Sequence, residues 1–465
     1  MAITNTPQER IDAILASQKE FFCTGATLSV KFRKEQLRKL AQALKEFEKP
    51  LADALWTDLH KSFQEAYLTE IGLVKAEIRE SLRHVGRWAR RKRVHTPLTL
   101  FPSSSFVVKE PLGCALIVSP WNYPVQLLLN PLVGAISAGC TAVLKPSPYV
   151  PNVSTVLEQL IRSVFPENYV AVIQGNRDVN KALFASRFDM IFFTGSPALG
   201  RKVMAAAAEN LTPVVLELGG KSPCIIDKSA NIKIAARRVA WGKTLNSGQT
   251  CIAPDYILIH EDVKEALIRE FAAQLEYLHG NDIKDSQHFV RMVSDKAFER
   301  VTGYLKDGTI VYGGRTDSKE RFIEPTLLDN VSPDSPVMTD EIFGPIFPMI
   351  TIHEKDASFK EQVEAFIKDR EKPLAFYYFG CEADGWDLIH RTSSGGGCIN
   401  DTIMHIANAG IPFGGVGNSG MGHYHGKLSF DAFTHERSIV KAPTWIDLPF
   451  RYMPYKFFAI IKRMM

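Results

Sequence analysis

The sequence lacks the features of several protein classes. No window approaches the roughly 18 consecutive apolar residues that a membrane-spanning helix needs, and the opening residues are polar where a secretory signal has an apolar segment. The seven cysteines are scattered and form no Cys-x-x-Cys pair, which argues against a disulfide framework and is typical of buried thiols in a reducing compartment. We therefore expect a cytoplasmic protein.

An excess of charge is absent as well. The 55 Lys and Arg residues nearly balance the 51 Asp and Glu residues, and the net charge of +4 leaves no basic footprint for nucleic acid. The 12 histidines show neither an HExxH motif nor paired Cys/His spacing, so we expect no metal site. The 465 residues, with an ordinary 45% apolar share, predict a globular protein of two or three domains.

Short apolar runs alternate with longer helix-like stretches through the middle of the chain. The runs are 114–119, 140–145, 170–174, 190–193 and 214–218. Strands that alternate with helices form a parallel sheet, and burial on both faces explains their nearly continuous apolar character. This pattern predicts a doubly wound, nucleotide-binding-type sheet. Helices are expected over the first ninety residues, a hairpin over 96–110, and a second α/β domain after Gly219.

Several polar residues have two interpretations, one catalytic and one structural. Cys251, in Asn-Ser-Gly-Gln-Thr-Cys, is either a reachable nucleophile or a buried thiol. Glu217 ends a strongly apolar strand, where desolvation suits a general base, although a salt-bridged structural carboxylate is the alternative. Asn122, between two prolines, is either an oxyanion donor or a turn asparagine.

Three further positions bear on a nucleotide. Gly195-Ser196-Pro-Ala-Leu-Gly200 follows a predicted strand and opens a helix, a context that favours phosphate binding but also suits an ordinary turn. It is not an NTPase loop, because Arg and Lys follow Gly200. Lys145 ends a predicted strand at the ligand edge of the sheet, or is simply solvated. Glu341, before a Gly-Pro turn, is read alone as a surface residue.

Taken together, seven motifs resemble those of the aldehyde dehydrogenase superfamily, in the family's order over roughly residues 10–440. They are PWNYP (120–124), AVLKPS (142–147), FTGS (193–196), LELGGKSP (216–223), NSGQTC (246–251), EIFGP (341–345) and PFGGVGNSGMG (412–422). The early start and short tail resemble the class 3-like branch, which acts on fatty and aromatic aldehydes.

The resemblance implies a mechanism. Cys251 would be the nucleophile that forms a thiohemiacetal and then a thioester. Asn122 and the Cys251 backbone N–H would hold the oxyanion, and Glu217 would activate the hydrolytic water. The product would be a carboxylic acid and the cofactor NAD or NADP.

The resemblance also implies binding roles. The cofactor would be bound by Lys145 and Glu341 at its two riboses, by Gly195, Ser196 and Gly200 at its diphosphate, and by Phe343 and Trp121. Trp121, Tyr123 and Trp241 would line the aldehyde tunnel, although aromatic residues at such positions are as often core. Many relatives carry a Glu after the lysine motif that repels a 2′-phosphate, and here Pro148 replaces it. We therefore expect NADP to be used as well as NAD.

The implied fold is two doubly wound Rossmann-like domains plus a small β bridging element. Residues 1–95 and 111–218 would form the NAD(P)-binding domain, 219–400 the catalytic domain, 96–110 and 401–440 the bridging element, and 441–465 a tail. In this family the bridging element adds a strand to a partner's sheet, which implies a homodimer. The tail's run Phe457–Ile461 between Lys456, Lys462 and Arg463 is expected to dock on protein, with adhesion to an anionic membrane as the alternative.

Two rival functions stay open. A relative that passes the acyl group to coenzyme A would keep the fold and the cysteine, but Glu217 argues against it because a water-activating base endangers the thioester. A non-catalytic structural protein on the same fold would be expected to lose Cys251 or Glu217, and the sequence retains both.

Overall fold

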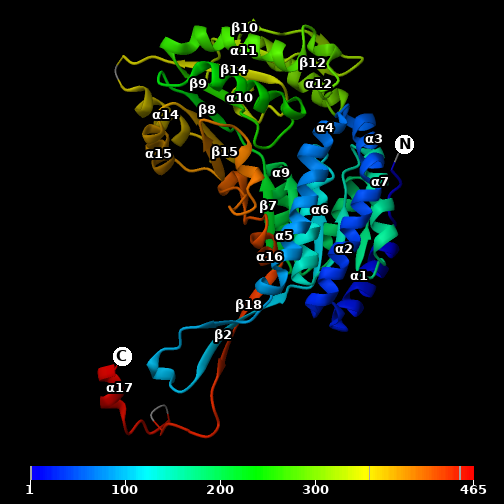
Figure 1. The fold of residues 1–465 in the computed structure, drawn as a ribbon, viewed down its shortest axis with the longest axis vertical. Coiled ribbons are helices and arrows are strands. Elements are labelled where there is room, and N and C mark those ends of the chain that lie inside the picture. Colours follow the sequence, from blue (N-terminus) through cyan, green and yellow to red (C-terminus); the bar gives the residue numbers. More distant parts are fainter. Residues whose placement is uncertain (1–2, 356, 450–451, 465) are drawn as a thin grey trace.

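The computed structural model describes residues 3–355, 357–449 and 452–464 of the chain. Two α/β domains, each built on a largely parallel sheet, face one another, and a β arm projects from them (Figure 1). Within the described residues, no helix is long and apolar enough to cross a membrane. No group of three His, Cys, Asp or Glu side chains in that part of the chain is arranged to hold a metal ion, and all seven cysteines have free thiols.

The first domain contains a six-stranded sheet of order β17-β7-β6-β3-β4-β5. Its strands are β3 (Cys114–Val118), β4 (Thr141–Lys145), β5 (Val170–Val172), β6 (Met190–Gly195), β7 (Val214–Leu218) and the antiparallel edge strand β17 (Gly420–Met421). The chain proceeds from β3 to one side of the sheet and then returns to β6 on the other. This reversal creates a crevice at the carboxyl ends of β3 and β6, where doubly wound sheets bind ligands.

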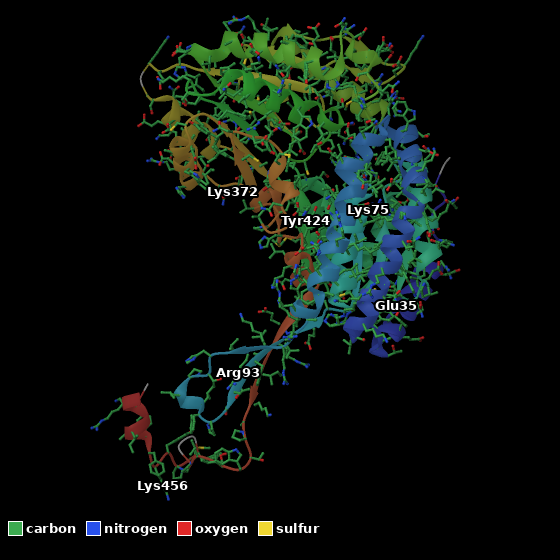
Figure 2. The ribbon with its side chains drawn as sticks, in the orientation of Figure 1. Glu35, Lys75, Arg93, Lys372, Tyr424 and Lys456 are labelled. Carbon is green, nitrogen blue, oxygen red and sulfur yellow. The ribbon has the colours of Figure 1, made fainter. Side chains whose placement is uncertain are left out.

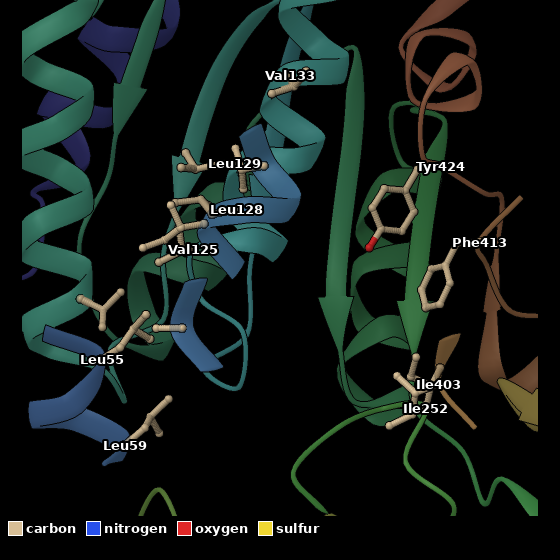
Figure 3. Close-up of a cluster of buried hydrophobic side chains, with 14 of the residues drawn as sticks. Leu55, Leu59, Val125, Leu128, Leu129, Val133, Ile252, Ile403, Phe413 and Tyr424 are labelled. Atoms are coloured by element: carbon tan, nitrogen blue, oxygen red, sulfur yellow. The ribbon is translucent and has the colours of Figure 1, made fainter. Parts of the chain in front are cut away.

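Helices cover both faces of this sheet. They are α1 (Gln8–Cys23), α2 (Val30–Glu46), α3 (Glu48–Leu59), α4 (Phe63–Ala66), α5 (Gly72–Trp88), α6 (Gln126–Ala138), α7 (Pro151–Val164), α8 (Arg177–Ala185) and α9 (Pro197–Ala208). Helix α6 is buried along its whole length, as its apolar composition dictates. Figure 3 shows Leu128 and Leu129 of α6 in the same cluster of buried side chains as Leu55 and Leu59 of α3.

The second domain contains a seven-stranded sheet of order β10-β13-β14-β9-β8-β15-β16, parallel except at the β10 edge. Its strands are β8 (Pro223–Ile226), β9 (Tyr256–His260), β10 (Thr309–Tyr312), β13 (Thr326–Asp329), β14 (Ile346–Ile352), β15 (Ala375–Phe379) and β16 (Gly396–Ile399). A separate ribbon pairs β11 (Thr316–Asp317) with β12 (Phe322–Ile323). The helices are α10 (Ile232–Thr244), α11 (Lys264–His279), α12 (Asp295–Thr302), α13 (Pro336–Thr339), α14 (Phe359–Lys368) and α15 (Glu382–Arg391).

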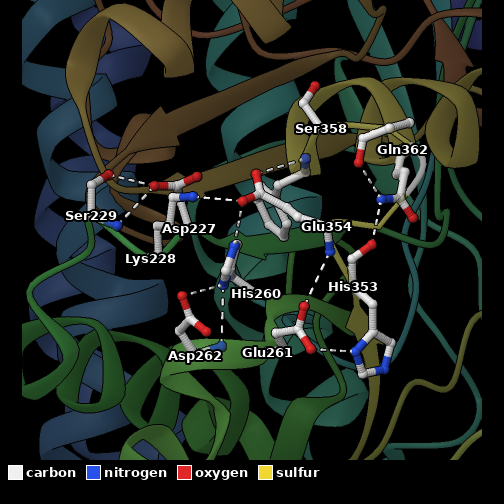
Figure 4. A network of polar contacts seen from close by, with 12 residues as sticks. Asp227, Lys228, Ser229, His260, Glu261, Asp262, His353, Glu354, Ser358 and Gln362 are labelled. Atoms are coloured by element: carbon white, nitrogen blue, oxygen red, sulfur yellow. Dashed lines mark hydrogen bonds and ion pairs between the residues drawn. The ribbon is translucent and has the colours of Figure 1, made fainter.

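A polar network ties the strand ends of the second domain to α14 (Figure 4). Glu354 follows β14 and pairs with Lys228 at 2.6 Å and with His260 of β9 at 3.2 Å. It also accepts the backbone N–H of Phe359 at the start of α14. These partners lower the pKa of Glu354 to about 2, with the Lys228 hydrogen bond as the largest cause. The carboxylate therefore stays charged and holds three elements together.

The arm is a three-stranded antiparallel sheet of order β1-β2-β18, formed by β1 (Lys92–Val94), β2 (Ser104–Pro111) and β18 (Thr434–Lys441). The hairpin expected over 96–110 is present, but its first strand lies earlier, at 92–94. The segment expected to join the arm, 401–440, divides: β17 pairs with β7 of the first sheet, α16 (Lys427–Ala432) packs on α6, and β18 belongs to the arm. Beyond it, α17 (Phe458–Met464) and Lys456 lie far from both domains (Figures 1 and 2).

Candidate active site

A cavity of about 850 Å³ lies between the two domains at the carboxyl ends of the first sheet. Residues from both domains line it. Of the residues that the sequence singled out, it brings together Trp121, Asn122, Gly195, Ser196, Glu217, Cys251, Glu341 and Phe343. Motifs spread over more than 200 residues of sequence therefore meet around one space.

An unusual backbone turn presents Cys251 to this cavity. The loop after α10 places Asn246, Ser247 and Gly248 at φ values of 51°, 55° and 71°. Successive residues in the left-handed region reverse the chain sharply. At Gly248 a side chain is excluded as well, because a Cβ would lie 2.3 Å from the Gly344 oxygen. The turn leaves Cys251 partly exposed within a buried loop.

Gln249 fastens the same loop to the second domain. Its side-chain amide donates to the backbone oxygens of Asn246 and Arg291, each at 3.1 Å, and its Oε1 accepts from Val293 N at 3.1 Å. All of these groups are buried, so the hydrogen bonds are not exchanged with water. The position of Cys251 is therefore set by the protein interior.

Glu217 has the environment of a general base. It is the penultimate residue of β7, is 3% exposed, and neither carboxylate oxygen has a hydrogen-bond partner among the described residues. Burial raises the pKa of Glu217 well above its usual value. Burial also raises the pKa of the Cys251 thiol, and the nearby carboxylates of Glu341 and Glu217 raise it further. The thiol thus needs a proton acceptor before it can act as a nucleophile.

Asn122, in the turn after β3, lines the same cavity as Glu217 and Cys251. Its Nδ2 donates to the Gln249 oxygen at 3.0 Å, which uses one of the two amide hydrogens and leaves the other to donate into the cavity. Its backbone oxygen accepts from Asn246 Nδ2 at 3.0 Å. Two hydrogen bonds therefore hold Asn122 against the loop that carries Cys251.

Glu341 reaches the cavity over a glycine. A Cβ on Gly219 would lie 1.9 Å from Glu341 Oε2, so only glycine permits this approach. The backbone N–H of Gly220 hydrogen-bonds the carboxylate, yet burial, with Asp255 nearby, raises the pKa of Glu341 well above its usual value. Phe343 packs edge-on against Trp121, with ring centroids 5.3 Å apart. Together they form an aromatic wall of the cavity.

Gly195 and Ser196 lie where β6 meets the N-terminus of α9, a site that favours anions. A second hollow of about 760 Å³ lies between α8 and α9, and it shares Ser196 and Ala198 with the main cavity. Gly200 lines neither hollow. A Cβ there would lie 2.7 Å from the Leu218 side chain, so this glycine lets α9 pack on β7.

Three other expected site residues do not reach the cavity. Lys145 is 1% exposed and its Nζ donates to the Pro146 oxygen at 2.8 Å. Tyr123 is buried behind Asn122, with its hydroxyl 2.7 Å from Thr250 Oγ1. Trp241 packs against the core from the last part of α10. Of the three aromatic residues expected in the aldehyde tunnel, the walls therefore include Trp121 but not Tyr123 or Trp241.

The cavity also has residues that sequence reasoning did not single out. They are Arg300, Arg370, Lys372 and Asn418. Asn418 belongs to one of the seven motifs, PFGGVGNSGMG, and the other three residues lie outside all of them. Lys221, within the LELGGKSP motif, lines the cavity too and pairs with Asp255. With Arg201, five cationic side chains line the cavity, beside the carboxylates of Glu217, Asp340, Glu341 and Glu371. The cations can attract the anionic part of a ligand.

Comparison with known proteins identifies the family to which the chain is similar. Residues 1–439 match the model of the aldehyde dehydrogenase family. Over 441 residues the chain is 48% identical to the 4,4′-diaponeurosporen-aldehyde dehydrogenase of Staphylococcus aureus, covering 94% of this chain and 95% of that protein. It is 40% identical over 448 residues to a Canis lupus familiaris protein named aldehyde dehydrogenase, dimeric NADP-preferring, covering 96% and 98%. A solved structure, the substrate-bound state of Staphylococcus aureus AldH, superposes with a TM-score of 0.95 at 47% identity, covering 97% and 99%.

Proposed function

Because the chain belongs to the aldehyde dehydrogenase family, we propose that Cys251, Glu217 and Asn122 perform its oxidation of aldehydes, with NAD or NADP as hydride acceptor. The observation that carries this assignment is the meeting of the three side chains at one cavity. Cys251 provides a nucleophile, Glu217 an unpartnered carboxylate, and Asn122 an amide with one hydrogen to spare.

The chemistry proceeds in two halves on Cys251. Its sulfur forms a bond to the aldehyde carbon after the thiol proton has passed to a base, and the carbonyl oxygen becomes an oxyanion. Asn122 Nδ2 and the Cys251 backbone N–H donate to that oxyanion. Loss of hydride from the carbon leaves a thioester. Glu217 then takes a proton from water, whose oxygen attacks the thioester and releases the carboxylic acid and the cysteine sulfur.

The residues around the cavity fit a dinucleotide. Bound NAD(P) supplies the hydride-accepting ring. Gly195 and Ser196 lie at the N-terminus of α9, where a phosphate is favoured, and two hollows that share Ser196 and Ala198 meet there. Glu341, brought close by Gly219, is placed to accept hydrogen bonds from ribose hydroxyls. Lys145 would have to release Pro146 before it could bind a ribose.

Use of NADP as well as NAD is part of the proposal. Pro148 offers no carboxylate to repel a 2′-phosphate, and the canine relative is named as NADP-preferring. For the aldehyde, we propose medium- to long-chain aliphatic or aromatic substrates. The Staphylococcus aureus relative, named for a diaponeurosporen aldehyde, supports an extended apolar substrate. A ratio of kcat/KM values that favours NAD more than about a hundredfold, which is roughly 2.7 kcal/mol, would contradict the argument from Pro148.

We also propose that the protein is a homodimer. Among the described strands, β18 pairs only with β2, so its outer edge has unpaired backbone groups that a partner strand would satisfy. The canine relative is named as dimeric.

The test compares the native chain with Cys251→Ala, Glu217→Gln and Asn122→Ala. Reduced cofactor and carboxylic acid are measured with hexanal, a long-chain aldehyde and benzaldehyde, each with NAD and with NADP. Cys251→Ala is expected to abolish turnover, whereas Glu217→Gln is expected to accumulate a thioester that mass spectrometry detects on Cys251. Cys398→Ala, which removes a half-buried thiol outside the cavity, is the matched control.

Two results would contradict the assignment. Turnover that persists in Cys251→Ala would remove the covalent route. A product that forms faster with coenzyme A, as an acyl thioester and not the free acid, would favour the acyl-transferring relative.

A further inference from the structure

An ion pair with no exposure to solvent lies directly behind Asn122. Lys61 Nζ and Glu70 Oε1 are 2.7 Å apart, and both side chains are 0% exposed. Lys61 follows the end of α3, and Glu70 lies in the π-helical turn Tyr67–Ile71. Such turns often mark functional sites. The N-terminal helices therefore place two opposite charges beneath the active-site cavity, although neither residue lines it.

Lys61 holds the backbone of the oxyanion donor. Its Nζ donates to the Asn122 oxygen at 3.0 Å as well as to Glu70, and it lies 4.3 Å from the centre of the Tyr123 ring. An ammonium group has three hydrogens, and these three contacts account for them. The backbone oxygen of Asn122 thus accepts two hydrogen bonds, one from Lys61 Nζ and one from Asn246 Nδ2.

Glu70 holds the helix that follows. Its Oε2 accepts from Val125 N at 2.8 Å and from Gln126 N at 3.4 Å, the first backbone donors of α6. Because α6 is buried throughout, water cannot satisfy these donors. A carboxylate at a helix N-terminus also interacts favourably with the helix dipole. Lys61 and Glu70 together clamp both ends of the segment from Asn122 to Gln126.

From this geometry we propose that Lys61 and Glu70 are positioning residues that aim the Asn122 amide at the oxyanion. The inference rests on the proposed role of Asn122. Stability alone does not account for the pair, because buried ion pairs are often replaced by apolar residues with little loss of stability. A misplacement of about 1 Å in a reacting group, in contrast, can lower a rate roughly a hundredfold.

The test separates reactions that need an oxyanion donor from one that does not. p-Nitrophenyl acetate acylates a thiol through a tetrahedral oxyanion and needs no cofactor. Iodoacetamide alkylates the same thiol by displacement of iodide, without an oxyanion. We would measure both rates at Cys251 in Lys61→Met, in the double variant Lys61→Met/Glu70→Leu, and in each of these combined with Asn122→Ala.

Lys264→Met is the matched control. It breaks the Lys264–Asp329 pair, 2.6 Å long and largely buried, in the second domain. It is expected to cost stability while both rates at Cys251 remain unchanged.

The expected result is selective. Lys61→Met should slow acylation roughly 10- to 100-fold, up to the effect of a misplaced reacting group and below the roughly 100- to 1000-fold loss when an oxyanion donor is removed, while alkylation changes less than about twofold. In the Asn122→Ala background the same substitution should slow acylation no further, because the group that it positions is gone. If Lys61→Met does not fold, the double variant, which removes both charges of the Lys61–Glu70 pair, carries the test.

Acylation at the native rate in the folded Lys61 variants would overturn the proposal. So would a loss that multiplies with that of Asn122→Ala. Failure of the underlying function gives a different result: Asn122→Ala alone would then acylate as fast as the native chain, whatever the Lys61 variants do.

Discussion

At the scale of single residues, the site depends on where side chains are missing as much as on where they stand. Gly219 has no Cβ, and Glu341 occupies the space that a Cβ would take. The carboxylate is thereby brought over the backbone between β7 and β8, where the Gly220 N–H hydrogen-bonds it. Gly248 serves the cysteine loop in the same way, by its approach to the Gly344 oxygen.

Gly219→Ala is therefore expected to weaken cofactor binding with little effect on the cysteine. The new methyl group pushes the Glu341 carboxylate away, and loss of a charge-assisted hydrogen bond of about 1.5–3 kcal/mol raises the KM for NAD roughly 10- to 100-fold. Steady-state kinetics with NAD measure the change, and iodoacetamide alkylation of Cys251 should not become slower. Gly303→Ala, whose Cβ meets nothing within 4 Å, is the control. A KM that stays at the native value would show that Glu341 does not bind the cofactor.

At the scale of elements, the pattern of apolar runs predicted the strands that are buried on both faces. The runs at 114–119 and 214–218 became β3 and β7 because parallel strands between helix layers are apolar throughout. β1 was not visible in the sequence, because Lys92–Val94 is short and charged. The pairing of β17 with β7 joins residues about 200 positions apart, and no local pattern specifies it.

In the site, too, the sequence identified some of the residues and did not reveal others. Cys251, Glu217, Asn122 and Glu341 lie in motifs whose family resemblance assigns them roles, and the structure gathers them at one cavity. Lys61 and Glu70, read along the chain, look like solvated charges on helices. Their burial follows from α6 lying across them, a tertiary contact that hydropathy does not encode.

Element packing also makes a pH prediction at Glu77 of α5. This carboxylate is 4% exposed and accepts from Gly426 N at 2.8 Å and Ser429 Oγ at 3.0 Å, joining α5 to the start of α16. Burial raises the pKa of Glu77 to about 6 from the ordinary value of 4.5. The folded state therefore holds a proton more tightly than the unfolded state, so this contribution to stability is complete below pH 4.5 and is lost as the pH rises through 6.

Glu77→Gln, which keeps an oxygen acceptor and cannot ionise, removes that dependence. Relative to pH 4.5, the native chain should lose about 2 kcal/mol more than the variant at pH 7.5. Thermal unfolding at the two pH values measures the difference in Tm. Glu35→Gln, on exposed surface in α2 (Figure 2), should follow the native chain at both. Equal shifts in Glu77→Gln and the native chain would refute the argument.

At the scale of the whole molecule, the arm and the tail are exposed in a way that a lone subunit does not explain. β18 runs for eight residues with nearly every side chain open to solvent. Beyond it, Trp445, Met453 and Phe458 are 77%, 79% and 62% exposed, and α17 lies far from the two domains (Figure 1). Soluble chains usually protect strand edges and apolar patches of this kind. A second copy that adds a strand at β18 would cover this edge.

The proposed dimer can be tested at the arm without disturbing either domain. Ile439 and Val440 of β18 are 39% and 56% exposed, so in an isolated subunit their replacement by lysine should cost no more than about 0.5 kcal/mol. In a dimer that buries this strand, Ile439→Lys/Val440→Lys places two like charges from each copy in the interface and should drive dissociation. Sedimentation equilibrium is expected to give about twice the 52.0 kDa chain mass for the native protein and about that mass for the variant. Tyr277→Lys, 73% exposed on α11, should remain at the native mass. A native protein that sediments as a single chain, with the arm variant unchanged, would refute the homodimer and leave the exposed edge of β18 to be covered by something other than a second copy.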